Sequence, residues 1–199
     1  MHSAPTFARP LSGFHEGPYL QFVTGIRDAS FDTEQSTNTV HGHDQEALFG
    51  FIFGWNLTDP WAVELSGHYS SPGLITNQEH LINVRLGTKW SWINNALTDF
   101  RSVRILPYLS AAGLAQVNVL PTAPTASAPR ALQWGIGPSV GAGVSGLFFH
   151  DAVYLSIGGL GDLVWRPERT QTIAGITTTA YRSTLDLEWT AIAAFGVHF

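Results

Sequence analysis

The chain has 199 residues, enough for one domain of moderate size, and a net charge of −5 at pH 7. Charged residues make up 13% of it, about half the share of a typical soluble domain, while aromatic residues reach 12% and glycines number 20. This balance excludes the basic surface of a nucleic-acid-binding protein and favours a sheet that faces lipid. The absence of cysteine excludes a disulfide framework and a thiolate metal site.

The chain shows no run of about 18 apolar residues, so the sequence predicts no transmembrane helix. Its first residues lack both the basic start and the apolar core of a signal peptide. We therefore expect a mature exported chain whose signal has been removed. Residues 1–16 carry little pattern and are expected to form a periplasmic N-terminal tail, while residues 17–199 are expected to form the single folded domain.

Eight segments alternate between apolar and polar residues with the period of two that marks a β-strand. In chain order they are residues 18–30, 46–55, 61–70, 80–92, 104–120, 132–149, 152–165 and 183–199. Long or polar connections (32–45, 71–79, 121–131 and 166–182) alternate with tight turns (56–60 and 150–151), and 93–103 is the one departure. An even number of strands with connections of alternating length is typical of bacterial outer-membrane barrels.

The last segment gives the strongest signal, because its odd positions are apolar from Leu185 to the final residue, Phe199. An aromatic residue at the end of such a strand is typical of outer-membrane barrels, and we interpret Trp189, Phe195, Val197 and Phe199 as a C-terminal insertion signal. Backbone groups in lipid must all be paired internally, so the sheet must close. The predicted fold is all-β: an eight-stranded antiparallel up-and-down transmembrane β-barrel. The alternative is a soluble lipocalin-like barrel or β-sandwich with its apolar faces turned inward.

The predicted barrel gives two groups of residues an expected position. Tryptophans at the strand ends are expected to form two aromatic girdles at the membrane interfaces: Trp55, Trp61, Trp90, Trp92, Trp134 and Trp165. Charged residues on the polar faces are expected to point into the lumen: Arg27, Glu64, Arg85, Lys89, Asp162, Asp186 and Glu188. Closure should bring Arg27 beside Asp186 and Glu188, and Glu64 beside Arg85 or Lys89. These charges form either a gate or a solid plug of paired side chains.

Three motifs carry a resemblance. They are Gly54-Trp-Asn-Leu-Thr-Asp-Pro-Trp-Ala-Val-Glu-Leu65, Leu106-Pro-Tyr-Leu-Ser-Ala-Ala-Gly113, and the pairing of Asp186-Leu-Glu-Trp189 with the final Ala-Phe-Gly-Val-His-Phe199. They resemble a strand–turn–strand pattern, a fifth-strand opening and a terminal strand of the small eight-stranded outer-membrane barrels, the OmpA/OmpW-like superfamily. The likeness runs over about residues 17 to 199. It implies a narrow barrel that moves small hydrophobic compounds, as OmpW-like members do, or one that anchors or adheres, as OmpA-like members do.

Two further motifs have weaker functional interpretations. His68-Tyr-Ser70, followed by Glu79, resembles the catalytic pattern of outer-membrane lipid A deacylases, although strand alternation places His68 and Ser70 in the lumen rather than on the lipid face. The pair His41 and His43 has the spacing of a divalent-cation site that lacks a further ligand. The alternative for this pair is a solvated polar loop.

The sequence therefore predicts an outer-membrane barrel protein that is not an enzyme and needs no cofactor or metal. Its favoured function is a narrow pore or lateral conduit for small hydrophobic solutes. The alternatives are a structural or anchoring subunit of a larger outer-membrane assembly, with a plugged lumen, and a lipid A deacylase-like hydrolase. Expected partners are outer-membrane lipid and lipopolysaccharide, the barrel-assembly machinery during insertion, and other outer-membrane or periplasmic subunits through the loops or the N-terminal tail. No nucleic-acid partner is expected.

Overall fold

A computed structural model describes residues 16–35, 38–58, 60–71, 80–92, 103–119, 132–149, 152–173, 176–181 and 183–199. Within these ranges it describes the backbone alone for residues 29–35, 38–45, 103, 169–173 and 176–181. In the described part of the chain, no helix is long and apolar enough to cross a lipid bilayer.

The described secondary structure consists of ten strands. They are β1 (Gly17–Gln35), β2 (Asn38–Asn56), β3 (Trp61–Ser71), β4 (His80–Ser91), β5 (Val103–Val119), β6 (Leu132–Phe148), β7 (Val153–Arg166), β8 (Arg169–Ile173), β9 (Ile176–Tyr181) and β10 (Thr184–His198). Eight of them form a closed barrel in the order β1-β10-β7-β6-β5-β4-β3-β2, in which every neighbouring pair is antiparallel. The predicted eight-stranded antiparallel barrel is confirmed.

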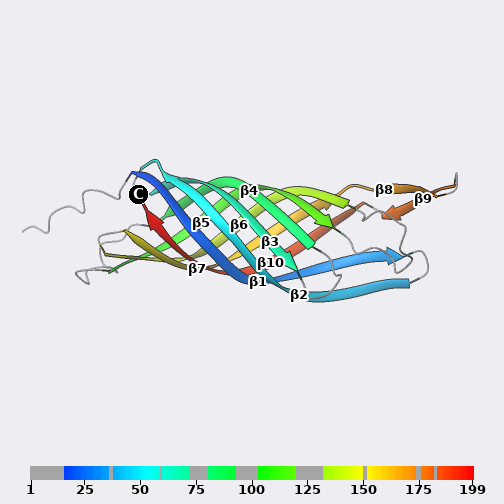
Figure 1. The fold of residues 1–199 in the computed structure, drawn as a ribbon, viewed down its shortest axis with the longest axis horizontal. Coiled ribbons are helices and arrows are strands. Elements are labelled where there is room, and N and C mark those ends of the chain that lie inside the picture. The colour runs from blue at the N-terminus through cyan, green and yellow to red at the C-terminus, as the bar shows by residue number, and fades with distance from the viewer. Residues whose placement is uncertain are drawn as a thin grey trace, which may run out of the picture.

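The barrel closes between its first and last strands. The Phe199 N–H donates to the Pro18 carbonyl at 3.0 Å, and the β1–β10 register runs from Tyr19 opposite His198 to Asp28 opposite Trp189. The start of β1 and the end of β10 therefore lie together at one end of the barrel, which we call the terminal end (Figure 1). The opposite end, which we call the ribbon end, carries the extension of β1 and β2 and the β8–β9 hairpin.

Buried and exposed residues alternate along each strand, but polar residues are buried and apolar residues are exposed, the reverse of a soluble protein. Along β10 the exposed positions are apolar and include Leu187 and Phe195, whereas the buried ones include Asp186 and Glu188. Every strand of the barrel likewise presents large apolar side chains outward. Burying charged groups while exposing apolar ones is favourable only if the outside is lipid and the inside is polar. This arrangement is that of a membrane-spanning barrel.

The structure differs from the sequence prediction at the ribbon end. The residues expected to connect the first two strands instead continue them, and the β1–β2 register extends to Gln35 opposite Asn38. Part of the expected connection at 166–182 is a second two-stranded sheet, β8–β9. Polar sequences rich in Thr, Ser and Asn carry little apolar alternation, so periodicity does not identify these ribbons as strands.

Candidate functional site

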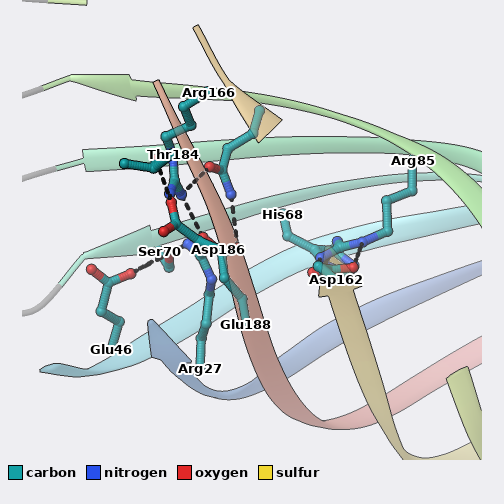
Figure 2. Close-up of polar contacts among 11 residues, drawn as sticks. Arg27, Glu46, His68, Ser70, Arg85, Asp162, Arg166, Thr184, Asp186 and Glu188 are labelled. Atoms are coloured by element: carbon teal, nitrogen blue, oxygen red, sulfur yellow. Dashed lines mark hydrogen bonds and ion pairs between the residues drawn. The ribbon is translucent and has the colours of Figure 1, made fainter. Parts of the chain in front are cut away.

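The candidate site is the lumen, where inward-facing side chains of several strands meet in three sets. The first set lies toward the ribbon end and centres on Arg27 of β1 (Figure 2). The Arg27 guanidinium forms ion pairs with Glu188 of β10 and, at 3.7 Å, with Glu46 of β2. The Ser70 hydroxyl donates to the Glu46 carboxylate at 2.7 Å and accepts from Arg27 at 3.4 Å. All four side chains are buried, so these charges meet inside the barrel and away from solvent.

Arg166, the last residue of β7, extends this set across the lumen. Its guanidinium forms ion pairs with Asp186 and, at 2.5 Å, with Glu188. It also donates to the side-chain carbonyl of Gln116 on β5 at 2.6 Å, while the Gln116 amide donates to Glu188 at 3.0 Å. Glu188 therefore accepts hydrogen bonds from Arg166 and Gln116 and forms an ion pair with Arg27, so it meets residues of three other strands. Charge-assisted hydrogen bonds of this kind hold the strands in a fixed register.

The second set joins β4 to β7. Arg85 donates to both oxygens of Asp162, from Nε at 3.3 Å and from Nη2 at 2.5 Å (Figure 2). Its Nη1 lies 2.7 Å from Nδ1 of His68 on β3. Because arginine can only donate, His68 accepts through Nδ1 and is a neutral imidazole in this contact. Asp162 is fully buried and Arg85 nearly so, which makes this a desolvated bidentate pair.

The third set lies at the terminal end. Lys89 of β4 forms an ion pair with Glu64 of β3 at 2.9 Å, and the Tyr19 hydroxyl donates to the same carboxylate. The Lys89 ammonium lies 4.9 Å from the ring centre of Tyr19 and 5.4 Å from that of Tyr108. Tyr19 in turn stacks on Tyr154 with ring centres 5.4 Å apart. The Lys89 ammonium thus forms one ion pair and two cation–π contacts, and both kinds of interaction are strong where the dielectric constant is low.

Glycines make room for these large lumen side chains. A Cβ added at Gly54 would lie 2.1 Å from the Tyr19 ring, and one added at Gly158 would lie 2.4 Å from the Tyr108 hydroxyl. A cavity between the second and third sets has a volume of about 50 Å³ and is lined by Glu64, His68, Arg85 and Lys89, among others. The described lumen is therefore largely filled by its own side chains.

Sequence reasoning placed seven charged residues in the lumen, and the structure shows where each lies. Arg27 meets Glu188, and Glu64 meets Lys89. Arg85 meets Asp162 rather than Glu64, and Asp186 meets Arg166 rather than Arg27. These two partners differ because Arg85 reaches a strand three places away in the barrel and Arg166 was assigned to a connection.

Five lumen residues were absent from the sequence-based site. Glu46 is the first residue of one expected strand, and Arg166 directly follows another. Tyr19, Tyr108 and Gln116 lie within expected strands but received no role. For Glu46 the signal was available, because continued alternation from Ile52 and Leu48 places it on the inner face.

His68 and Ser70, which form the deacylase-like motif of the sequence, both contact charged residues inside the lumen. His68 contacts Arg85. The Ser70 hydroxyl donates a hydrogen bond to the Glu46 carboxylate rather than to an imidazole. Glu79 lies outside the described residues. These contacts pair His68 with Arg85 and Ser70 with Glu46, so they do not place His68 as the base of a serine nucleophile.

The residues assigned to the girdles and to the C-terminal signal lie on the outer face. Trp134 and Trp165 meet edge to face with ring centres 5.9 Å apart, and Trp90 lies beside Trp92 at 6.4 Å. Trp90 is half-buried, whereas the others are exposed: Trp55, Trp61, Trp92, Trp134, Trp165, Trp189, Phe195, Val197 and Phe199. For His41 and His43 the structure describes the backbone, which belongs to β2; their side chains lie outside the description.

Solved structures with the same fold were found, and they are bacterial outer-membrane barrels. Neisserial surface protein A matches with a TM-score of 0.65 and 14% identity over 92% of this chain and 97% of its own. The N-terminal β-barrel domain of OprF from Pseudomonas aeruginosa matches with a TM-score of 0.55 and 17% identity over 92% and 98%. The outer-membrane protein OprG from the same organism gives 0.53 and 13% over 93% and 97%. No protein-family model and no curated protein matches the chain.

At these identities the likeness concerns the fold alone. The chain has the fold of the small eight-stranded outer-membrane β-barrels, which confirms the resemblance stated from the sequence. The matches do not single out an OmpW-like subgroup. Together with the apolar outer face, they support a location in a bacterial outer membrane.

Proposed function

We propose that this chain is a closed, non-conducting outer-membrane barrel that serves as a structural or anchoring subunit. The observation that carries the proposal is the lumen, which is filled by three sets of buried, paired side chains. Two contacts between strands three places apart, Arg85–Asp162 and Gln116–Glu188, cross it. In this proposal the interior fixes the shape of the barrel, and the outer face and the ribbon end meet partners. Those partners are outer-membrane lipid, lipopolysaccharide and other envelope subunits, with the barrel-assembly machinery acting during insertion.

The Arg85–Asp162 pair argues most directly against a permanent pore. β4 and β7 are separated by two strands on one side of the barrel and by four on the other, so this pair spans the lumen. Removing one partner of a buried ion pair typically costs about 3–5 kcal/mol, so a path that separates the pair is unfavourable. The cavity between the second and third sets, about 50 Å³, is also smaller than the ~150 Å³ that accommodates benzene in a protein core.

A lateral conduit for small hydrophobic solutes is the second candidate, and one observation favours it. The β6–β7 ladder runs from Phe148 opposite Val153 to Ser139 opposite Asp162, then skips Gly137 and Pro138 before it resumes at Ile136. Proline has no N–H to donate, so this stretch of the wall is held by fewer hydrogen bonds. A solute would still have to displace the Asp162 pair behind the gap.

The test of a structural role is the size of the protein in its own membrane. The chain is solubilised from outer membranes at native expression level, after cross-linking in the intact cell, and its apparent mass is compared with that of purified barrel in the same detergent. A defined complex larger than the barrel supports the proposal. An uncomplexed barrel, together with solute uptake that falls when the gene is deleted, would favour the conduit instead.

A further inference from the structure

The extension of β1 and β2 beyond the barrel brings together residues that are separate in the sequence. The β1–β10 ladder ends at Asp28 opposite Trp189, and the β2–β3 ladder ends at Ala47 opposite Ser71. β1 and β2 continue to pair with each other as far as Gln35 opposite Asn38. We call this two-stranded extension, residues 29–35 and 38–46, the ribbon; it projects from the barrel in Figure 1.

The register of the ribbon places an acidic residue of β1 opposite one of the pair His41 and His43. Asp32 of β1 lies directly opposite His41 of β2, and Ser30 lies opposite His43. Residues opposite each other in an antiparallel pair share a face, and so do residues two apart on one strand. Positions 32, 41 and 43 therefore occupy one face of the ribbon, and position 34, a glutamate, is next on the same face.

The same register separates Asp44 from this group. Asp44 follows His43 directly in the sequence, so the run His-Gly-His-Asp looks like a linear set of three ligands. It lies opposite Ala29, one step along the ladder from the Ser30–His43 pair, and so belongs to the other face of the ribbon. The ladder thus selects Asp32 over Asp44 as the carboxylate that accompanies the two histidines.

We propose that Asp32, His41 and His43 form a binding site for a divalent transition-metal cation of the zinc, nickel and copper class. Two imidazoles and one carboxylate are ligands that these metals accept, and water or Glu34 would complete the coordination. Opposite Cβ atoms in such a ladder lie about 4.5–5.5 Å apart, a separation that one cation bridges. Between positions 29 and 45 the chain carries three acidic residues and neither lysine nor arginine, which favours a cation.

The site would clamp the two strands of the ribbon at a point where neither neighbouring barrel strand supports them. Among the side chains that the structure does describe, no other group of three histidine or carboxylate residues is arranged to hold a metal. The inference stands apart from the proposed structural role, since the ribbon could bind a cation whether or not the lumen conducts.

The test is calorimetric titration of ZnCl₂ into the full, tag-free chain folded in detergent micelles. One zinc per chain is expected, and either His41→Ala or His43→Ala should remove the binding. Asp32→Asn should weaken it by at least the roughly 10–100-fold that losing an outer-shell partner costs a metal site, because it removes a direct ligand.

The matched control is Asp44→Asn, which removes the same charge from the opposite face and should leave the affinity unchanged. All four substitutions lie beyond the barrel ladders, and folding of each variant is checked by its heat-dependent gel mobility before titration. Three results would overturn the proposal: no saturable zinc binding by the wild type, binding that survives both histidine substitutions, or an equal loss in Asp44→Asn and Asp32→Asn.

Discussion

Arg85 and Asp162 face each other across the lumen from β4 and β7 and share two hydrogen bonds, at 3.3 and 2.5 Å. A bidentate pair between strands that are not neighbours ties opposite walls of the sheet together, which backbone ladders cannot do. Hydrogen bonds between neighbouring strands close the barrel around its circumference. The Arg85–Asp162 ion pair, in addition, connects two of its walls across the interior.

The first prediction concerns this pair. Arg85→Leu should destabilise the folded barrel by about 3–5 kcal/mol, because Asp162 is left buried without its cation. The double variant Arg85→Leu with Asp162→Leu should recover most of that loss, since no charge remains to be desolvated. Urea unfolding in lipid vesicles measures all three free energies. A single-variant cost below about 1 kcal/mol would mean that the pair is not buried as described.

The second prediction concerns the close contact between the first and last strands. A Cβ added at Gly25 would lie 2.1 Å from the Ala191 carbonyl oxygen of β10, so Gly25→Ala must push the strands apart. We expect a loss of about 1–3 kcal/mol in the same unfolding assay. Gly67→Ala is the control, because a Cβ there meets nothing within 4 Å. Equal effects at both positions would contradict the strand register at the closure.

The third prediction concerns which face meets lipid. Phe51→Arg, on the exposed face of β2, should cost about 2–4 kcal/mol if it lies near the bilayer midplane. Leu57→Arg, in the turn after β2, should cost about 0–1 kcal/mol because an arginine near the interface remains hydrated. Stabilities are compared in vesicles of one lipid composition. If Phe51→Arg were as harmless as Leu57→Arg, the apolar face would not be the lipid face.

The fourth prediction concerns assembly in the cell. The Phe199 N–H holds the end of β10 against Pro18 of β1, and its ring lies exposed on the outer face. Removing Phe199 should lower the amount of folded barrel in the outer membrane, whereas Phe199→Tyr, which keeps the backbone and an aromatic ring, should not. Heat-dependent gel mobility of outer-membrane fractions quantifies the folded form. Unchanged levels after the deletion would show that the last residue is no insertion signal.

The fold was predictable because lipid imposes a strict alternation. From Leu185 to Phe199 each outward position is apolar, and this pattern alone identifies the strand and its lipid face. The closing pair Arg27 and Glu188 was predictable as well, because closure makes their strands neighbours. The pair Glu64 and Lys89 was predictable for another reason: β3 and β4 follow each other in the chain and pair as neighbouring antiparallel strands.

The remaining contacts depend on three-dimensional geometry that sequence spacing does not contain. Arg85 finds Asp162 because the barrel is narrow enough for a long side chain to cross it, and that depends on strand tilt and stagger. Arg166 lies where periodicity ends, so its inward direction was not evident. The opposition of Asp32 and His41 follows from a register that a polar ribbon specifies only weakly in its sequence.

Single-channel recording in a planar bilayer tests the closed lumen most directly. The wild-type barrel, shown to be folded in the same lipid, should give no discrete openings. Replacing Arg85 and Asp162 together by serine should leave the barrel silent as well, because the first and third sets still fill the lumen on either side of this pair. Steady openings of the wild type that Glu64→Gln alters would contradict the account and make the lumen charges a gate.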